Sequence, residues 1–261
     1  MSQGRGHGQA QSEGQGQGVK TLEGWYALHD FRTIDWNAWK ALSEEDRARA
    51  KDELISLMGE WSNVGEQKQG STAVYTCIGH KADLTFMHLR PTLAELDELE
   101  NAFNKTLLAE VTIPSYSYVS VVELSTYIDA NVDPETDPYI QGRLKPNLPK
   151  TQYINFYPMN KKRDGNDNWF MLPLEDRARM MRDHGMIGRK YAGRVTQVIS
   201  GSVGLDDWEW GVTLFADDPV VFKHLIYEMR FDEASARYGE FGTFFVGSRL
   251  DPESLSSYLE V

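Results

Sequence analysis

The sequence predicts an α+β fold in which one order of elements, β-α-β-β-α-β, occurs twice. Strand-like and helix-like segments follow this order between residues 21 and 130, and the same order recurs between residues 151 and 261. A proline-rich stretch at 131–150 separates the two halves. Because residue identity between the halves is low, the repeat is one of element order alone. We therefore expect two ferredoxin-like (βαββαβ) modules that form a dimeric α+β barrel within one chain.

The first half shows its elements through period and capping residues. Aromatic and β-branched residues mark the strands, Asp35 is a candidate N-cap, and Thr92-x-x-Glu95 is a capping-box pattern. The expected order is a strand at 22–34, a helix from Asp35 to about 61, two strands within 71–89 around the turn 79–81, a helix from 92 to about 110 and a strand at 116–127.

The second half shows the same order. We expect a strand at 152–158, a helix at 174–191 entered through Pro173, strands at 195–203 and 208–216, a helix from Asp218 to about 238 and a strand at 241–248. Residues 131–150 contain four prolines and no helical period, which predicts a long connecting loop. Residues 1–20 are mostly Gly, Gln and Ser, which predicts a disordered tail.

Composition excludes several classes of function. With 27 Lys plus Arg against 39 Asp plus Glu, the chain has a formal charge of −12, which disfavours nucleic-acid binding and attachment to anionic membranes. No apolar run is long enough to span a membrane, and the N-terminus has no apolar signal-peptide core. The single cysteine, Cys77, allows neither an intramolecular disulfide nor a cysteine-cluster metal site. We expect a reduced, cytoplasmic protein.

One strand carries an unusual set of polar side chains. The segment YPMNKKR at 157–163 continues the strand QYINFYP, and alternation puts Tyr157, Met159 and Lys161 on one face. If Ile154 and Phe156 pack on helices, that face points into the barrel, where a lysine requires an anionic partner such as an acidic ligand. The alternative is that the strand ends at this point and the basic residues form a solvated turn.

A single histidine stands out among the helices. His184 has Met180 and Met181 before it and Gly185 and Gly188 after it, which leaves room for a large, flat, apolar ligand. Haem fits this setting, because a neutral imidazole is a standard axial ligand of its iron. The i+4 position is Gly188 rather than a second ligand, which disfavours a non-haem metal centre. The alternative is a core histidine that is hydrogen-bonded to the backbone.

Four long segments together resemble one family. INFYPMNKKR, MMRDHGMIGRKYAG, VTQVISGSVGLDDWEWGVTLFADDP and KHLIYEMRFDEASARYGEFG are similar to the coproheme decarboxylases (HemQ-type proteins) of the chlorite dismutase superfamily, in their Gram-positive bacterial form. The resemblance runs from about residue 21 to the C-terminus. It implies the same pair of ferredoxin-like modules, with the porphyrin in the second module, and an assembly of five subunits.

The resemblance also implies roles for individual residues. His184 corresponds to the axial ligand of the iron, Tyr157 to a tyrosine that forms a catalytic radical, and Lys161 to a lysine that contacts a propionate and assists proton movement. The remaining residues that the resemblance assigns to porphyrin binding are Arg143, Pro158, Met159, Asn160, Gln197, Arg230 and Ser235. Chlorite-decomposing relatives carry an arginine where this chain has Gln197, and a neutral amide cannot stabilise an anionic oxo-chlorine ligand as a guanidinium does.

The implied activity is peroxide-dependent oxidative decarboxylation of two propionates of iron-coproporphyrin III (coproheme), which gives haem b. The implied partners are coproheme, hydrogen peroxide, other copies of the chain in a homopentamer and an upstream ferrochelatase. Two alternatives remain open at this point: a haem peroxidase or chlorite-detoxifying enzyme, and a non-catalytic haem carrier.

Overall fold

The computed structural model describes residue 18, residues 20–125, residue 133 and residues 135–261. The predictions of a disordered tail and of the start of the connecting loop therefore fall largely outside the described residues. In the first half the elements are β1 Thr21–Ile34, α1 Trp36–Ala41, α2 Glu44–Glu66, β2 Ser71–Thr76, β3 Leu84–Arg90, α3 Leu93–Asn104, α4 Leu107–Glu110 and β4 Thr112–Ser125.

The second half begins with a short helix and ends with another. Its elements are α5 Pro138–Leu144, β5 Tyr153–Lys161, β6 Arg163–Asp164, β7 Asp167–Asn168, a 3-10 turn at Trp169–Met171, α6 Leu174–Arg189, β8 Thr196–Gly201, β9 Trp210–Ala216, α7 Val220–Met229, α8 Glu233–Tyr238, β10 Gly239–Phe241, β11 Phe245–Ser248 and α9 Pro252–Tyr258.

A large antiparallel sheet organises the described residues, as expected for an α+β protein. Nine of their strands share this sheet, in the order β10-β5-β9-β8-β4-β1-β3-β2, with β11 also paired to β5. Each half contributes its four main strands in the same relative order, β4-β1-β3-β2 and β11-β5-β9-β8. An antiparallel bridge between Tyr75 and Arg249 and a hydrogen bond from Ile78 N to Val246 O join β2 to β11, so the two ends of the sheet meet.

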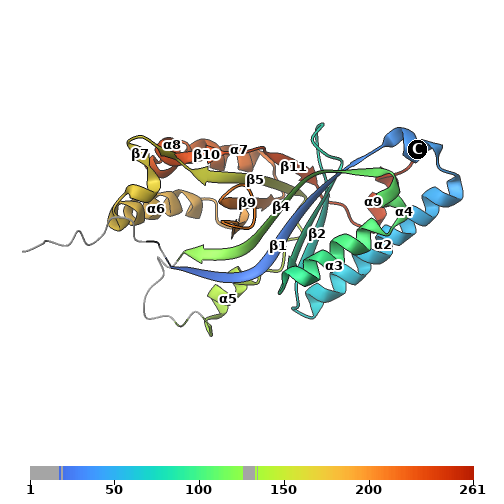
Figure 1. Cartoon of the computed structure of the whole chain (residues 1–261), viewed down its shortest axis with the longest axis horizontal. Coiled ribbons are helices and arrows are strands. Elements are labelled where there is room, and N and C mark those ends of the chain that lie inside the picture. The colour runs from blue at the N-terminus through green and yellow to red at the C-terminus, as the bar shows by residue number, and fades with distance from the viewer. Residues whose placement is uncertain (1–17, 19, 126–132, 134) are drawn as a thin grey trace, which may run out of the picture.

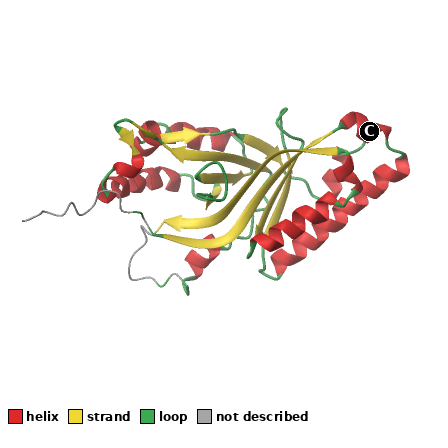
Figure 2. Ribbon diagram, in the orientation of Figure 1, coloured by secondary structure: helices red, strands yellow, loops and turns green. Residues whose placement is uncertain are grey.

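Most of the helices lie in two groups at opposite ends of the molecule, and α5 lies apart from both. In Figure 1, α2, α3 and α9 occupy one end and α6, α7 and α8 the other, with the strands running between them. Figure 2 shows the same separation of helices from strands. Among the described residues, none of the helices combines the length and the hydropathy that crossing a bilayer requires.

Three helices that the sequence predicts as continuous are each divided in two. The expected helices at 35–61, 92–110 and 218–238 are α1 with α2, α3 with α4, and α7 with α8. Each second helix has its own N-cap, since Ser43, Thr106 and Asp232 accept backbone N–H bonds from residues three positions later. The helical period continues through these points, so periodicity alone does not reveal the breaks.

The prediction of a loop throughout the connecting segment 131–150 is wrong for its middle. Helix α5 lies there, with Asp137 as its N-cap and Pro138 in its first turn. Its Ile140 and Leu144 side chains are buried in a cluster with Leu124 of β4. The helix is stabilised by this tertiary contact. It is too short to show a helical period in the sequence.

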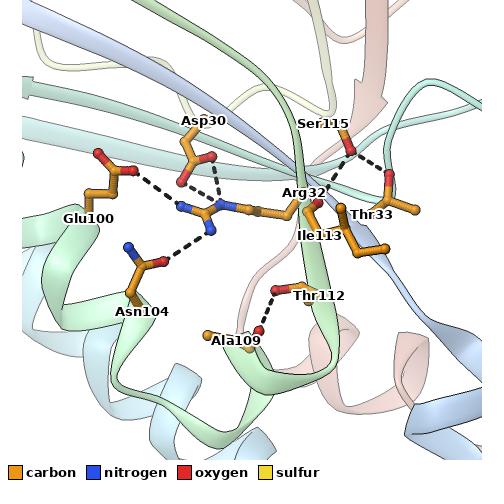
Figure 3. Close-up of polar contacts among 9 residues, drawn as sticks. All are labelled: Asp30, Arg32, Thr33, Glu100, Asn104, Ala109, Thr112, Ile113 and Ser115. Atoms are coloured by element: carbon orange, nitrogen blue, oxygen red, sulfur yellow. Dashed lines mark hydrogen bonds and ion pairs between the residues drawn. The ribbon is translucent and has the colours of Figure 1, made fainter.

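The helices of the first half close tightly on the sheet. Trp39, Leu54, Trp61, Phe86 and Phe103 belong to one continuous, fully buried cluster. A buried guanidinium strengthens the contact between α3 and β1: Arg32 donates to Asp30 at 2.7 Å and to Asn104 at 3.0 Å (Figure 3). Arg32 also lies over the Phe103 ring, 5.0 Å from its centroid. The space between sheet and helices is thus filled by side chains of the first half together with Leu250, Leu255 and Leu259 near the C-terminus.

Candidate functional site

Strand β5 carries the predicted tyrosine and lysine, and it is longer than expected. It continues to Lys161, so the alternative in which the strand ends before a solvated basic turn is wrong for this residue. Alternation along the strand is as predicted, but the two faces are reversed. Phe156 packs with Phe31 and Tyr118 of the first half, whereas Tyr157 packs with Phe222 and Leu225 of α7.

The reversal has a simple physical cause. The interior between the two halves is filled by aromatic side chains, with Phe156 stacked on His29 at 4.1 Å between centroids. Phe156 supplies more apolar area to that contact than Tyr157, whose hydroxyl group would be left without water there. Tyr157 therefore faces the helices of its own module, where it stacks on Phe244 at 4.4 Å. Burial raises the pKa of Tyr157 above its usual range, so the phenol is neutral at physiological pH.

Lys161 is buried at the far end of the same strand. Its Nζ atom donates a hydrogen bond to the Ala234 carbonyl at 3.0 Å and lies 4.7 Å from the centroid of the Trp169 ring. Burial lowers the pKa of Lys161 to about 8, although the carboxylates of Asp232 and Glu209 act in the opposite direction. The lysine is therefore mainly protonated at neutral pH but gives up its proton more readily than a surface lysine.

His184 is held in place by a buried carboxylate. On α6, its Nδ1 atom lies 3.0 Å from Oδ2 of Asp232, whose side chain is 3% exposed, whereas the imidazole is 26% exposed. Ser235 completes the group, since its hydroxyl lies 3.0 Å from the same carboxylate oxygen and 3.4 Å from Nδ1. Because an ionised carboxylate only accepts hydrogen bonds, this contact favours the tautomer of the neutral imidazole that carries its proton on Nδ1 and a lone pair on Nε2.

The electrostatics of Asp232 agree with this geometry. Burial by itself raises the pKa of Asp232, but hydrogen bonds with His184 and Ser235 outweigh it and the resulting pKa lies below the usual value. Asp232 is therefore an anion at neutral pH. It lies between two candidate functional groups, His184 on one side and Lys161 on the other.

These residues fit an imidazole that would hold an iron-porphyrin. A histidine that binds a metal usually donates its other ring N–H to a carboxylate, and Asp232 supplies that acceptor. The helix beside the imidazole is open, because a Cβ atom at Gly185 would meet no atom within 4 Å. Within the described residues, no group of three His, Cys, Asp or Glu side chains is arranged to hold a metal ion, so His184 would act as a single protein ligand.

Arg143 and Gln197 meet at a small pocket away from His184. Arg143 lies in the last turn of α5 and Gln197 on β8, and both line a cavity of about 100 Å³ together with Glu123. The register connects this pocket to Tyr157. Gln197 pairs with Leu214, which pairs with Asn155, and paired residues of antiparallel strands share a face. Gln197 and Tyr157 thus lie on one face of the sheet.

The other predicted residues lie on the margins of this arrangement. Pro158 accepts a hydrogen bond from Gly242 N at 2.8 Å, and Asn160 Oδ1 accepts one from Glu209 N at 2.8 Å, so both hold the end of β5. Met159 packs against the cluster that contains Tyr157. Arg230 is exposed at the end of α7, two positions before Asp232.

Sequence reasoning missed Asp232, Trp169 and Glu209. The pattern Asp232-x-x-Ser235 is a helix N-cap signal, and this role fully accounts for the aspartate when the sequence is taken alone. Only the packing of α8 against α6 shows that the same carboxylate reaches His184.

The family model described as chlorite dismutase matches residues 47–250. A solved structure of a heme-binding protein from Thermus thermophilus is 53% identical, covers 93% of this chain and 97% of its own, and superposes with a TM-score of 0.89. A chlorite dismutase variant from Candidatus Nitrospira defluvii, solved in complex with cyanide, is 21% identical over 91% of this chain and 96% of its own, with a TM-score of 0.73, and shows the same fold.

The family match spans most of the folded part of the chain and includes the strand of Tyr157, the helix of His184 and the turn of Asp232. The chain belongs to the chlorite dismutase family.

Proposed function

We propose that this protein binds iron-coproporphyrin III and uses hydrogen peroxide to convert two of its propionates into vinyl groups, giving haem b. The sheet then acts as the barrel of two ferredoxin-like modules, with the porphyrin between the sheet and the helices of the second module. The observation that carries the proposal is that the second module holds both an anchored imidazole and a buried phenol. His184 on α6 is fixed by Asp232, and Tyr157 on β5 lies in a cluster that α6 also contacts through Ile187.

The second module is the better candidate because it contains both the imidazole of His184 and the phenol of Tyr157. The cluster around Tyr157 includes several partly buried side chains, among them Met159, Ile187 and Phe244. Ile187 lies one turn after His184 on α6, so the helix that carries the histidine also contacts the cluster of the tyrosine. The 53% identical relative described as heme-binding supports a porphyrin as the ligand.

When bound, the iron-porphyrin supplies one-electron oxidation driven by peroxide. The residues of the chain carry out the rest. Tyr157 gives up an electron and its phenolic proton, and the resulting radical takes a hydrogen atom from the propionate carbon beta to the carboxylate. The substrate then loses a second electron and carbon dioxide, which leaves a vinyl group, while peroxide accepts the two electrons and becomes water.

The surroundings of Tyr157 suit this relay. Its raised pKa keeps the proton on the phenol until an electron is removed, so acid–base ionisation does not compete. Lys161, four positions along the same strand, provides an ammonium that can hold a propionate and return a proton. The amide of Gln197 on the same sheet face favours peroxide over chlorite chemistry. By family resemblance, we propose a homopentamer that receives coproheme from a ferrochelatase.

The experiment mixes the purified full-length protein with ferric coproheme and peroxide and follows the porphyrin by mass spectrometry. Two successive losses of carbon dioxide with two hydrogens support decarboxylation. An unchanged porphyrin that stays bound supports a carrier instead, and oxygen release from chlorite supports a chlorite-decomposing enzyme.

Tyr157→Phe is the variant that isolates the radical step. We expect it to bind coproheme like the wild type, because the ring and its contact with Phe244 remain, but to form no haem b. Tyr153→Phe, on the same face of the same strand, is the matched control and should form haem b normally. Normal turnover by Tyr157→Phe rules out the relay.

A further inference from the structure

Glu123 is a partly buried carboxylate in the pocket of Arg143 and Gln197, and the mechanism above does not use it. On β4, its Oε1 atom accepts a hydrogen bond from Trp210 Nε1 at 2.8 Å. Gly201 makes room for this side chain, since any Cβ at that position would clash with the carboxylate. The indole hydrogen bond orients the carboxylate, and the absence of a side chain at Gly201 leaves the space that it occupies.

The strand register places Glu123 on the same sheet face as Tyr157 and Gln197. Val121 pairs with Gly201, Gly201 with Trp210, and Trp210 with Met159, so alternate residues from Glu123 across to Tyr157 share this face. Strands β4, β8, β9 and β5 are consecutive, so Glu123 lies three strand spacings from Tyr157, about 14 Å. A macrocycle placed on this face therefore has the phenol at one margin and the carboxylate toward the other.

The charges around Glu123 favour proton uptake. Glu23 of β1 pairs directly with it across the ladder, and like charges in that position repel. The Trp210 indole from β9 is a neutral donor, and Arg143 of α5 lines the same pocket. Burial, followed by the repulsion from Glu23, raises the pKa of Glu123 against the opposing effect of the Trp210 hydrogen bond. A carboxylate with a raised pKa is a stronger base than an ordinary glutamate.

The size and lining of the pocket define the ligand. A volume of about 100 Å³ holds a few water-sized molecules and excludes a macrocycle. The lining combines a base, a guanidinium and a neutral amide, supplied by Glu123, Arg143 and Gln197. A carboxylate base and a neutral amide in one small pocket suit a small, protic molecule that must lose a proton.

We propose that Glu123 is the proton acceptor for hydrogen peroxide in this pocket. This inference rests on the proposed function. In the step, the O–H bond of peroxide breaks, its proton joins the Glu123 carboxylate, and the electron pair stays on the hydroperoxide anion. No electron is transferred, and Gln197, which carries no charge, orients the anion.

The test uses hydrogen cyanide, another small acid that must lose its proton to bind iron, on full-length protein loaded with ferric coproheme. Loading is checked first by the Soret band, so a failure of the proposed function appears before any cyanide is added. We expect Glu123→Gln, which keeps an oxygen acceptor for Trp210, to slow cyanide association by about 100-fold at neutral pH. Association within about twofold of the wild type overturns the inference without affecting the porphyrin site.

Two further measurements keep the inference testable if Glu123→Gln fails to load. In the apoprotein, we expect an infrared carboxyl band that titrates above the ordinary glutamate range and that disappears in Glu123→Gln. In Glu23→Gln this band should titrate at a lower pH, because the repelling negative charge of Glu23 is removed. In the loaded protein, Glu23→Gln should shift the acid limb of cyanide association to lower pH. The proposal is contradicted if the Glu123 carboxyl band titrates in the ordinary glutamate range and does not shift in Glu23→Gln.

Discussion

Asp232 shows how one side chain can serve both the fold and the site. Its Oδ1 atom accepts the Ser235 N–H as the N-cap of α8, while Oδ2 binds His184 Nδ1. Asparagine caps helices as well as aspartate does, so Asp232→Asn separates the two roles. We expect the free energy of unfolding of this variant to stay within about 1 kcal/mol of the wild-type value, because the cap is retained.

The same variant should bind porphyrin more weakly, because a neutral amide holds the imidazole less firmly than a carboxylate. We expect a loss of about 10- to 100-fold in affinity, measured by Soret titration of the apoprotein with ferric coproheme. Asp251→Asn, at the N-cap of α9, is the matched control and should bind like the wild type, because α9 and α6 lie at opposite ends of the molecule (Figure 1). Unchanged affinity in Asp232→Asn would show that the Asp232 carboxylate does not contribute to porphyrin binding by His184.

At the scale of elements, the meeting of β2 with β11 depends on a glycine. A Cβ atom at Gly247 would clash with the Thr76 carbonyl oxygen, which belongs to backbone and cannot rotate away. Gly247→Ala should therefore lower the free energy of unfolding by about 1–3 kcal/mol, measured by chemical denaturation.

Gly59 in the interior of α2 provides the opposite case. A Cβ atom there meets nothing within 4 Å, so Gly59→Ala should raise the stability by about 0.5–1 kcal/mol through helix propensity. If both variants changed stability equally, the effect of Gly247→Ala would reflect alanine in general and not the contact between β2 and β11.

At the scale of the whole molecule, His29 links the two halves. From β1 of the first half, its Nε2 lies 2.8 Å from Thr213 Oγ1 of β9, and its ring stacks on Phe156 of β5. Burial lowers the pKa of His29 from 6.5 to about 3. Between these two pH values the unfolded chain binds a proton that the folded chain does not. The free energy of unfolding should therefore fall as the pH decreases below 6.5.

The contribution of His29 to this slope is at most about 1.4 kcal/mol per pH unit. His29→Gln, which removes the titrating group, should give a shallower slope in the same window when unfolding is followed at several pH values. His80→Gln, at an exposed turn, is the matched substitution outside the core. A slope that is the same in all three proteins would show that His29 titrates normally in the fold.

The sequence by itself determined the class of fold, the repeated element order and the residues that we propose for the site. The alternation of side chains along 153–161 shows which residues share a face with Tyr157. The sequence around His184 distinguishes it from the other histidines. Both properties depend only on neighbours along the chain. Tertiary structure decided which way those faces point. Phe156 fills the interior between the halves and turns Tyr157 toward α7, and α8 brings Asp232 to His184 across 48 positions of sequence. Such contacts are set by how packed elements fill space and satisfy buried charge, and local sequence patterns do not record them.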